Sequence, residues 1–189
     1  QGFGREISED LAREGAAVIL ADINEQGVRE AAEALCAAHG PGRATAVTMN
    51  VADGASVAAA VSAAVRAYGG FDVFIANAGV LRAESVYTQS ERDFDFVTSV
   101  NYKGYYLCVQ HAAPVLAAQH RARPRRWGDI IQINSKSGLA GSKRNFAYAG
   151  GKFGGIGLTS RSPWSSSRPA SRSTPSARDR KSTRLNSSH

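Results

Sequence analysis

A hydroxyl, a phenol and an ammonium group lie close together in one stretch of the sequence, INSKSGLAGSKRNFAYAGGK. Ser135 follows an apolar run, and Tyr148 and Lys152 stand four positions apart in a segment predicted to be helical, so they would share a helix face. A phenol with a pKa of about 10 is a poor base at neutral pH, and a nearby cation stabilises the phenolate. The three groups indicate proton exchange with an alcohol or carbonyl whose oxygen Ser135 also bonds.

Asn101 and a nicotinamide cofactor would complete this chemistry. Asn101 interrupts a long predicted helix, where it could hold a water molecule that links Lys152 to solvent. Proton exchange with an alcohol is half of an oxidation, and hydride transfer to a nicotinamide supplies the other half. The alternative interpretation is a surface tyrosine beside a solvated lysine.

The elements that would position these groups alternate between strand and helix. Apolar runs predict strands at residues 16–22, 44–51, 71–79 and 128–135. The segments between and around them predict helices at residues 5–14, 24–38, 56–69, 90–121 and 145–159. Crossover helices of this length force parallel pairing, and the continuous apolar strands indicate helices on both faces. The predicted fold class is α/β, a doubly wound parallel sheet (Rossmann fold) that is incomplete at both ends.

Glycines and a carboxylate near the start of the chain indicate a dinucleotide site. Gly2, Phe3 and Gly4 precede a helix and are expected to form a loop whose N–H groups approach a pyrophosphate. Asp22 ends the next strand, where a carboxylate would bind the adenosine ribose and repel the 2′-phosphate of NADP. NAD is therefore the predicted cofactor. The alternative is that Asp22 only begins a turn before Asn24.

Two further strand ends carry residues suited to the same ligand. Asn50 and Val51 are expected to line an adenine pocket. After the next strand, Asn77 is followed by the small residues Ala78 and Gly79, which would let a ribose lie close to the backbone. Ligands of open parallel sheets collect beyond the carboxyl ends of the strands, so these positions belong to the predicted cofactor site.

Composition and charge favour a single cytoplasmic domain. The chain has 189 residues with 43% hydrophobic content, and no apolar run approaches the roughly 20 residues of a membrane helix. The start lacks the features of a signal peptide, and Cys36 and Cys108 show no disulfide or metal spacing, so no metal site is expected. The net charge is +7, and most of it lies in residues 161–189. The basic loop at residues 121–127 is interpreted as a solvated connection, so neither nucleic acid nor membrane is an expected partner.

Both ends of the chain differ from a complete domain. The chain starts inside the predicted glycine loop, so residues 1–160 are interpreted as a partial NAD-binding domain that carries the catalytic residues. Residues 161–189 contain ten serines and few core-forming side chains, which predicts a disordered, non-native tail. The last eleven residues can be translated from a string resembling a sequencing-library adapter. The hypothesis is a frameshift near Arg161.

These motifs together resemble the short-chain dehydrogenase/reductase family over residues 1 to about 160. The matching positions are Gly2, Gly4, Asn77, Ala78, Gly79, Asn101, Ser135, Tyr148 and Lys152. The resemblance implies an NAD-dependent oxidoreductase in which Tyr148 is the general acid/base. The same resemblance implies that Tyr148 and Lys152 bind the cofactor, Lys152 at the nicotinamide ribose. It also implies a parent enzyme that is a homodimer or homotetramer. Asn50 departs from the family, which usually has Asp there.

Within the family, GDIIQINSKSG, GSK and KFGGIGLT are similar to dehydrogenases of sugar-alcohol phosphates. This similarity implies a small-molecule substrate and the interconversion of sorbitol 6-phosphate and fructose 6-phosphate. Lys136 and Lys143 flank the loop beside Arg144, where cations would attract a phosphate; alternatively they are exposed loop charges. Two other interpretations stay open, an enzyme for an unphosphorylated polyol or another secondary alcohol, and an inactive fragment of such an enzyme.

Overall fold

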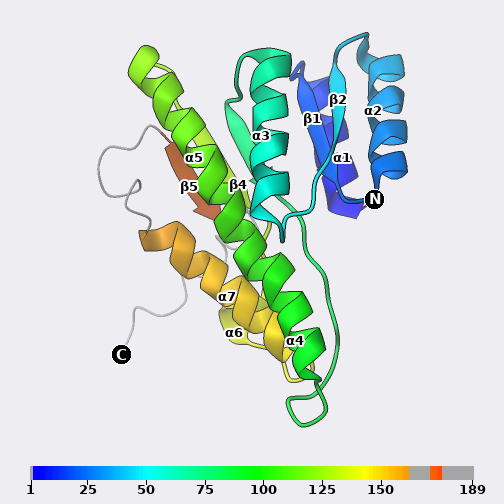
Figure 1. Ribbon diagram of the computed structural model, residues 1–189, viewed down its shortest axis with the longest axis vertical. Helices are drawn as coiled ribbons and strands as arrows, with labels where there is room; N and C mark the ends of the chain where they lie inside the picture. Colours follow the sequence, from blue (N-terminus) through cyan, green and yellow to red (C-terminus); the bar gives the residue numbers. More distant parts are fainter. Residues whose placement is uncertain (1, 162–170, 176–189) are drawn as a thin grey trace, which may run out of the picture. The chain divides into compact units, whose positions relative to one another are not determined.

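The computed structural model describes residues 2–161 and 171–175. The chain divides into two compact units, residues 1–69 and residues 70–189. Each unit contains parallel strands connected by helices, as Figure 1 shows, so the predicted α/β class is confirmed. The two units are described separately below, and the prediction that residues 1–160 form one domain stays a prediction.

The first unit contains three helices and a two-stranded parallel sheet. Its elements are α1 (Gly2–Arg13), β1 (Val18–Asp22), α2 (Glu25–His39), β2 (Ala44–Thr48) and α3 (Gly54–Tyr68). The register of β1 and β2 runs from the pair Val18 and Ala44 to the pair Asp22 and Thr48. Polar side chains set two of the helix starts, because Asn24 accepts a hydrogen bond from the N–H of Gly27 and Asp53 accepts one from that of Ala55.

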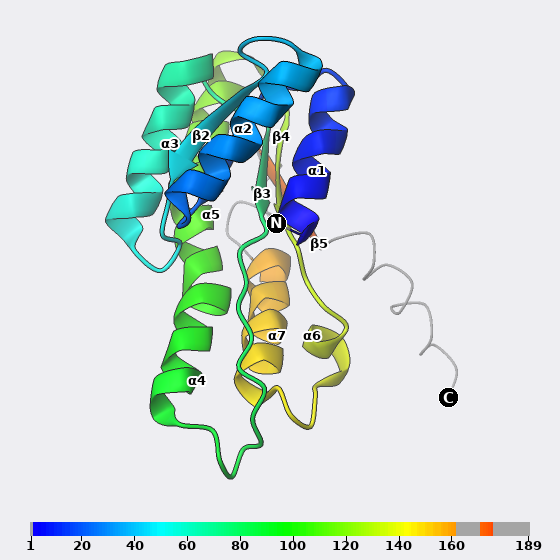
Figure 2. The ribbon, with the colours of Figure 1, turned by 90° about the vertical axis from the view of Figure 1, so that its right-hand side faces the viewer.

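One apolar core joins α1 and α2 to the strands of this unit. Its buried members are Ala12, Val18, Leu20, Val28, Ala32, Leu35 and Ala44. The buried residues of α3 are not part of this cluster, although α3 packs against β2. Figure 2 shows α1 and α2 together beside the strands. The core therefore fixes β1, and with it the strand end that carries Asp22.

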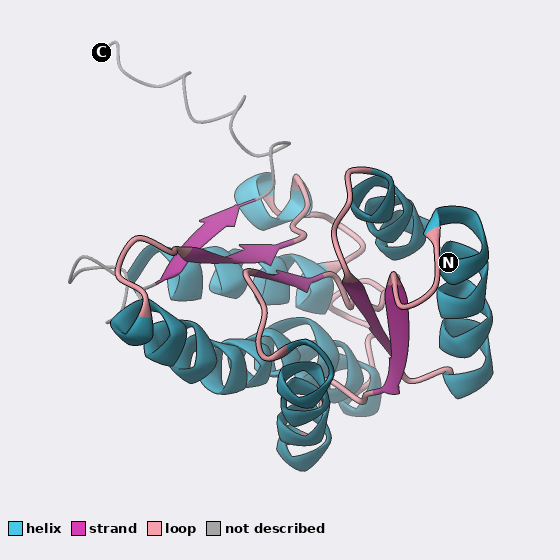
Figure 3. Cartoon of the chain, turned by 90° about the horizontal axis from the view of Figure 1, so that it is seen from above, coloured by secondary structure: helices cyan, strands magenta, loops and turns pink. Residues whose placement is uncertain are grey.

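The second unit is built on a three-stranded parallel sheet in the order β3-β4-β5 (Figure 3). Its strands are β3 (Val73–Ala76), β4 (Gly128–Gln132) and β5 (Ser171–Pro175). Its helices are α4 (Glu91–Thr98), the π-helix η1 (Ser99–Lys103), α5 (Gly104–Ala122), α6 (Ser137–Ala140) and α7 (Phe146–Arg161). Ile130 of β4 is fully buried with Leu116 and Ala112 of α5, and Leu158 of α7 packs against the same cluster. Helices α5 and α7 thus hold the strand that leads into Ser135.

Three features of the fold differ from the sequence-based expectations. Gly2 to Gly4 form the first turn of α1 rather than a separate loop. The interruption at Asn101 is a π-helical turn within a continuous helical segment, and the short helix α6 was not predicted. The sequence predicts disorder throughout residues 161–189, but residues 171–175 form β5. Parallel pairing with β4 explains this strand, because it satisfies backbone groups along that edge. Residues 162–170 and 176–189 of the predicted tail lie outside the described residues.

The described residues contain neither a membrane-spanning helix nor a cluster of metal-binding side chains. Across residues 2–161 and 171–175, no helix combines the length and apolar character needed to cross a bilayer. Across the same ranges, no three His, Cys, Asp or Glu side chains gather into a group able to hold a metal ion.

Truncation of Ile130 tests the core of the second unit. The side chain has 0% exposure, so Ile130→Ala should lower the free energy of unfolding by about 2–5 kcal/mol through lost burial and a residual cavity. Urea unfolding followed by circular dichroism measures the change. Val86→Ala is the matched control, because Val86 is 56% exposed and its truncation should have little effect. Equal losses for the two variants would contradict the assigned core.

Candidate functional site

The second unit brings Tyr148 and Lys152 together as the sequence predicts. Both lie on α7, and the Lys152 Nζ atom is 5.7 Å from the centroid of the Tyr148 ring. Lys152 is 5% exposed, whereas Tyr148 is half-buried. The phenol therefore has access to solvent beside a buried cation.

The buried ammonium of Lys152 connects helix α7 to the end of strand β4. Its Nζ atom donates a hydrogen bond of 2.7 Å to the carbonyl oxygen of Ile133, the residue after β4. Ile133 in turn donates its N–H to the carbonyl oxygen of Ala76 at the end of β3. Hydrogen bonds through Ile133 thus connect Lys152 to the carboxyl ends of two neighbouring strands, β3 and β4.

Asn134 positions Ser135 relative to the same helix. Its side-chain oxygen accepts a 2.7 Å hydrogen bond from the N–H of Ser135. Its side-chain nitrogen donates to the carbonyl oxygen of Lys152 and to the side-chain oxygen of Gln132, both at 3.1 Å. The Ser135 hydroxyl accepts a weaker bond, 3.3 Å, from the N–H of Ser137. Asn134 therefore ties the loop that carries the hydroxyl to the helix that carries the ammonium.

Two glycines allow the backbones around Lys152 to approach closely. A Cβ atom on Gly138 of α6 would lie 2.9 Å from the Lys152 Cβ atom and 2.8 Å from the Asn134 side-chain oxygen. A Cβ atom on Gly151 would lie 3.4 Å from the Asn101 Cβ atom. A side chain at Gly138 would therefore displace the lysine, and one at Gly151 would crowd η1.

Asn101 is buried in η1 and bonds the loop after β3. It is 2% exposed, its side-chain oxygen accepts from the N–H of Val80, and its side-chain nitrogen donates to the carbonyl oxygen of Val80, both at 2.8 Å. The neighbouring Gly79 lies close to both groups: a Cβ atom there would be 3.5 Å from the Asn101 side-chain oxygen and 3.6 Å from Lys152 Nζ. Both atoms of the Asn101 amide thus bond the backbone of Val80, and the water link between Asn101 and Lys152 stays a prediction. Asn77, Ala78 and Gly79 form the loop between β3 and Val80.

The other predicted cofactor residues lie in the first unit. Phe3 is 61% exposed in the first turn of α1, where helix N–H groups lack intrahelical acceptors. Asp22 is exposed at the end of β1, and its Oδ1 atom accepts a 3.0 Å bond from the N–H of Asn24. Asp22 therefore does begin a turn, and only one of its carboxylate oxygens is used there. The Asn50 side chain accepts from the N–H of Ala52, and Val51 is half-buried.

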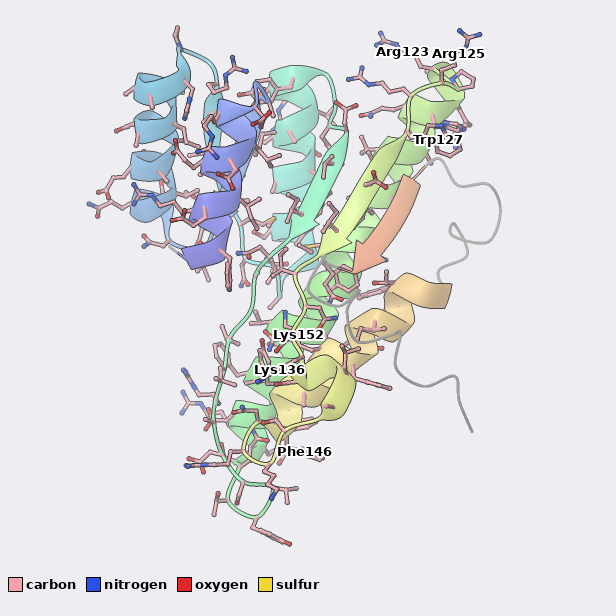
Figure 4. The ribbon with its side chains drawn as sticks, turned by 180° about the vertical axis from the view of Figure 1, so that it is seen from behind. Arg123, Arg125, Trp127, Lys136, Phe146 and Lys152 are labelled. Atoms are coloured by element: carbon pink, nitrogen blue, oxygen red, sulfur yellow. The ribbon has the colours of Figure 1, made fainter. Side chains whose placement is uncertain are left out.

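The predicted substrate lysines are exposed near the catalytic loop. Lys136 immediately precedes α6, and Figure 4 shows it in the same region as Lys152. Lys143 lies in the loop between α6 and α7. Within the described part of the chain, neither lysine pairs with a carboxylate. Both ammonium groups are therefore accessible to an anion.

Two buried groups near α5 keep their protons. Burial raises the pKa of the Tyr105 phenol, which shares a 2.8 Å hydrogen bond with Thr159 of α7. Burial also raises the pKa of the Cys108 thiol to about 12. Both groups are neutral at physiological pH, so they add no charge to the region around Lys152.

Sequence reasoning missed the residues that hold the site together. No sequence pattern predicts the role of Asn134, because it is a single amide side chain outside any repeat. No pattern predicts the role of the Ile133 carbonyl either, because every residue has this backbone group. The glycines of α7 did carry a signal. Gly151, Gly154 and Gly155 recur at helical spacing, and side chains at these positions would meet Asn101, Tyr102 and Gln132.

Comparisons with known proteins identify the family. A sequence profile described as short chain dehydrogenase matches residues 1–163. Sorbitol-6-phosphate 2-dehydrogenase of Escherichia coli (strain K12) is 33% identical over 159 residues, which cover 84% of this chain and 60% of the relative. The 3-oxoacyl-acyl-carrier-protein reductase FabG of Thermotoga maritima is also 33% identical, over 162 residues that cover 84% of this chain and 61% of the relative.

Solved structures agree with the sequence comparisons. The crystal structure of sorbitol-6-phosphate 2-dehydrogenase SrlD from Erwinia amylovora matches with a TM-score of 0.79 and 37% identity, covering 84% of this chain and 60% of that one. A short chain dehydrogenase/reductase from Burkholderia phymatum, solved in complex with NAD, matches with a TM-score of 0.84 and 26% identity, covering 92% and 60%. This chain thus spans about 60% of the length of these relatives. It belongs to the short-chain dehydrogenase/reductase family.

Proposed function

We propose that this chain carries the NAD-binding and catalytic residues of an oxidoreductase that interconverts a sugar-alcohol phosphate and a ketose phosphate, with sorbitol 6-phosphate and fructose 6-phosphate as the substrate pair. The observation that carries the proposal is the buried Lys152 ammonium beside the Tyr148 ring, bonded to the strand end that leads into Ser135. Family membership supports this assignment of roles, since both residues stand at matching positions.

In this proposal, Tyr148 exchanges a proton with the substrate oxygen. In the oxidation direction the phenolate oxygen takes the alcohol proton, and Ser135 donates a hydrogen bond to the oxygen that becomes the carbonyl. Lys152 stabilises the phenolate through its positive charge. Asn101 holds the loop at Val80, and thereby Gly79, against the lysine.

Residues within each of the two units suit a part of a nicotinamide dinucleotide. When bound, NAD supplies the acceptor for the hydride that leaves the substrate carbon. The N-terminus of α1, whose partial positive charge favours an anion, suits a pyrophosphate, and the exposed Asp22 carboxylate suits a ribose diol. A carboxylate at that position disfavours the additional phosphate of NADP, so we expect a preference for NAD. We expect the nicotinamide ribose to lie near Gly79 and Lys152, which are close to each other: a Cβ atom on Gly79 would be 3.6 Å from the Lys152 Nζ atom.

The phosphate of the proposed substrate would be bound by Lys136 and Lys143. Both are exposed cations without a carboxylate partner among the described residues, and a compact ammonium is a common phosphate ligand. Sequence identity alone does not choose the substrate, because the sorbitol-6-phosphate 2-dehydrogenase and FabG relatives are equally identical to this chain. An unphosphorylated polyol is therefore the second candidate substrate. The two candidates differ in whether Lys136 and Lys143 contribute to substrate binding.

Replacement of Tyr148 tests the general acid/base. Tyr148→Phe removes only the hydroxyl, so the rate of NADH formation from sorbitol 6-phosphate should fall about 10²–10⁴-fold. NAD affinity, measured by calorimetry, should change little. Tyr106→Phe is the matched control, because Tyr106 is an exposed tyrosine of α5. A Tyr148→Phe variant as active as Tyr106→Phe would exclude the proposed role. If the unaltered chain bound NAD but oxidised no polyol, the alternative of an inactive fragment would hold.

Replacement of Asn134 tests the link between the serine and the lysine. Asn134→Ala leaves the Ser135 N–H and the Lys152 carbonyl without this partner, which should cost about 1–3 kcal/mol of stability. It should lower kcat more than it raises KM. Asn134→Asp retains an acceptor for Ser135 but loses the donor, so it separates the two bonds. Steady-state kinetics of both variants, beside urea unfolding, measure the effect. Unchanged kcat in both would show that the link is unnecessary.

Replacement of the two lysines tests phosphate recognition. The double variant Lys136→Gln, Lys143→Gln should raise KM for sorbitol 6-phosphate about tenfold or more, because charge-assisted hydrogen bonds to the phosphate are lost. Its KM for unphosphorylated sorbitol should not change. Arg66→Gln removes an exposed cation of α3 and serves as the control. An unaltered chain that oxidises both polyols at equal rates would favour the second candidate.

A further inference from the structure

The turn between α5 and β4 presents a group of arginines that the proposed catalytic function does not use. We refer to residues 121–127 as the arginine turn; its basic members are Arg121, Arg123, Arg125 and Arg126. It precedes Gly128, the first residue of β4, whereas Ser135 follows the other end of that strand. Figure 4 shows Arg123, Arg125 and Trp127 at the far end of α5 from Lys136 and Lys152. The arginine turn is therefore separate from the candidate catalytic residues.

Hydrogen bonds hold the backbone of the arginine turn in one conformation. The N–H of Arg123 donates to the carbonyl oxygen of Gln119, and the N–H of Arg126 donates to that of Arg123, both at 2.9 Å. The Arg126 guanidinium donates to both carboxylate oxygens of Asp72, at 2.6 Å and 2.9 Å. A surface that is already ordered loses little conformational entropy when it binds a partner.

Only one of these four arginines is neutralised. Arg126 pairs with Asp72, and in the described part of the chain Arg121, Arg123 and Arg125 form no ion pair although all three are exposed. Arg121 lies in the last turn of α5, where its positive charge interacts favourably with the negative end of the helix dipole. Arg123 and Arg125 lie beyond that turn, and within residues 2–161 and 171–175 neither guanidinium donates to the carbonyl groups at the helix end. Among the described residues, these two cations therefore have no carboxylate partner.

An aromatic side chain lies next to these cations. Trp127 is 44% exposed, and its ring packs on His120 with centroids 4.5 Å apart. His120 is itself held to the turn, because its Nδ1 atom is 3.2 Å from the carbonyl oxygen of Arg126. Tryptophan and arginine are the residue types that most often dominate the binding energy of protein interfaces.

We propose that the arginine turn is a docking site for an acidic peptide segment of a partner protein, with carboxylates on Arg123 and Arg125 and an apolar side chain on Trp127. The fork of a guanidinium matches a carboxylate with two parallel hydrogen bonds. The cations are confined to one short turn, whereas a nucleic-acid site presents a basic stripe along the polymer. The local charge and shape therefore favour a peptide over a polynucleotide.

Fluorescence anisotropy of labelled peptides tests the proposal. The probe is a fluorescein-labelled oligoglutamate peptide that ends in phenylalanine, titrated with the full chain at fixed ionic strength. The double variant Arg123→Gln, Arg125→Gln should weaken binding about tenfold or more. Trp127→Ala should weaken binding of this peptide several-fold, but not of an oligoglutamate without phenylalanine. Arg126 is left intact so that its bond to Asp72 keeps the turn in place, which circular dichroism can verify.

Matched controls separate the turn from other basic segments. Arg178→Gln, Arg180→Gln removes the same charge from the C-terminal segment and should leave the peptide affinity unchanged. An equal loss in this variant, or no loss in the turn variant, would overturn the proposal. A single-stranded oligonucleotide of equal charge that bound more tightly than the peptide through Arg123 and Arg125 would overturn it in favour of a polynucleotide. NAD affinity should be the same in every variant, so this test is independent of the proposed catalytic function.

Discussion

The ammonium group of Lys152 is the constraint on which the second unit depends. A cation taken out of water is stable only where oxygen atoms replace its hydration, and the desolvation cost is several kcal/mol. The carbonyl oxygen of Ile133 supplies one such atom after the end of β4, and the centroid of the Tyr148 ring lies 5.7 Å from the same ammonium. Strand, loop and helix must therefore meet at one place, and Asn134 bonds the same three segments.

Close approach of backbones makes this meeting possible. Lys152 can be buried beside α6 because Gly138 presents no side chain toward it, and α7 can approach η1 because Gly151 presents none toward that helix. Glycine lowers the intrinsic stability of a helix by about 1 kcal/mol relative to alanine, so α7 depends on its packing to remain helical. A Cβ atom added at Gly150 or Gly157 would meet no described atom within 4 Å, so no close packing requires glycine at these two positions. The same segment thus contains glycines that the packing requires and two, Gly150 and Gly157, that it does not.

The sequence predicted those features that depend on residues close together along the chain. The pairing of Tyr148 with Lys152 and the capping of α2 by Asn24 follow from helical geometry, and the strands follow from apolar runs. The roles of Asn134 and Gly138 could not be predicted, since both depend on contacts with Lys152, a residue far along the chain. Pairing also explains β5, whose composition alone favours disorder and which forms beside β4. The catalytic, cofactor and substrate roles stay predictions that the proposed experiments address.

The π-helical turn η1 has a consequence for how insertions and deletions would act on this fold. A π turn accommodates about one residue more than an α turn, so the side-chain faces of α4 and α5 are out of phase by about 100°. Loss of a single residue between Ser99 and Lys103 would restore a regular helix and rotate one flank relative to the other. Asn101 would then turn away from Val80, while the helix itself could remain intact. Chain length across these five positions is therefore as restrictive as residue identity.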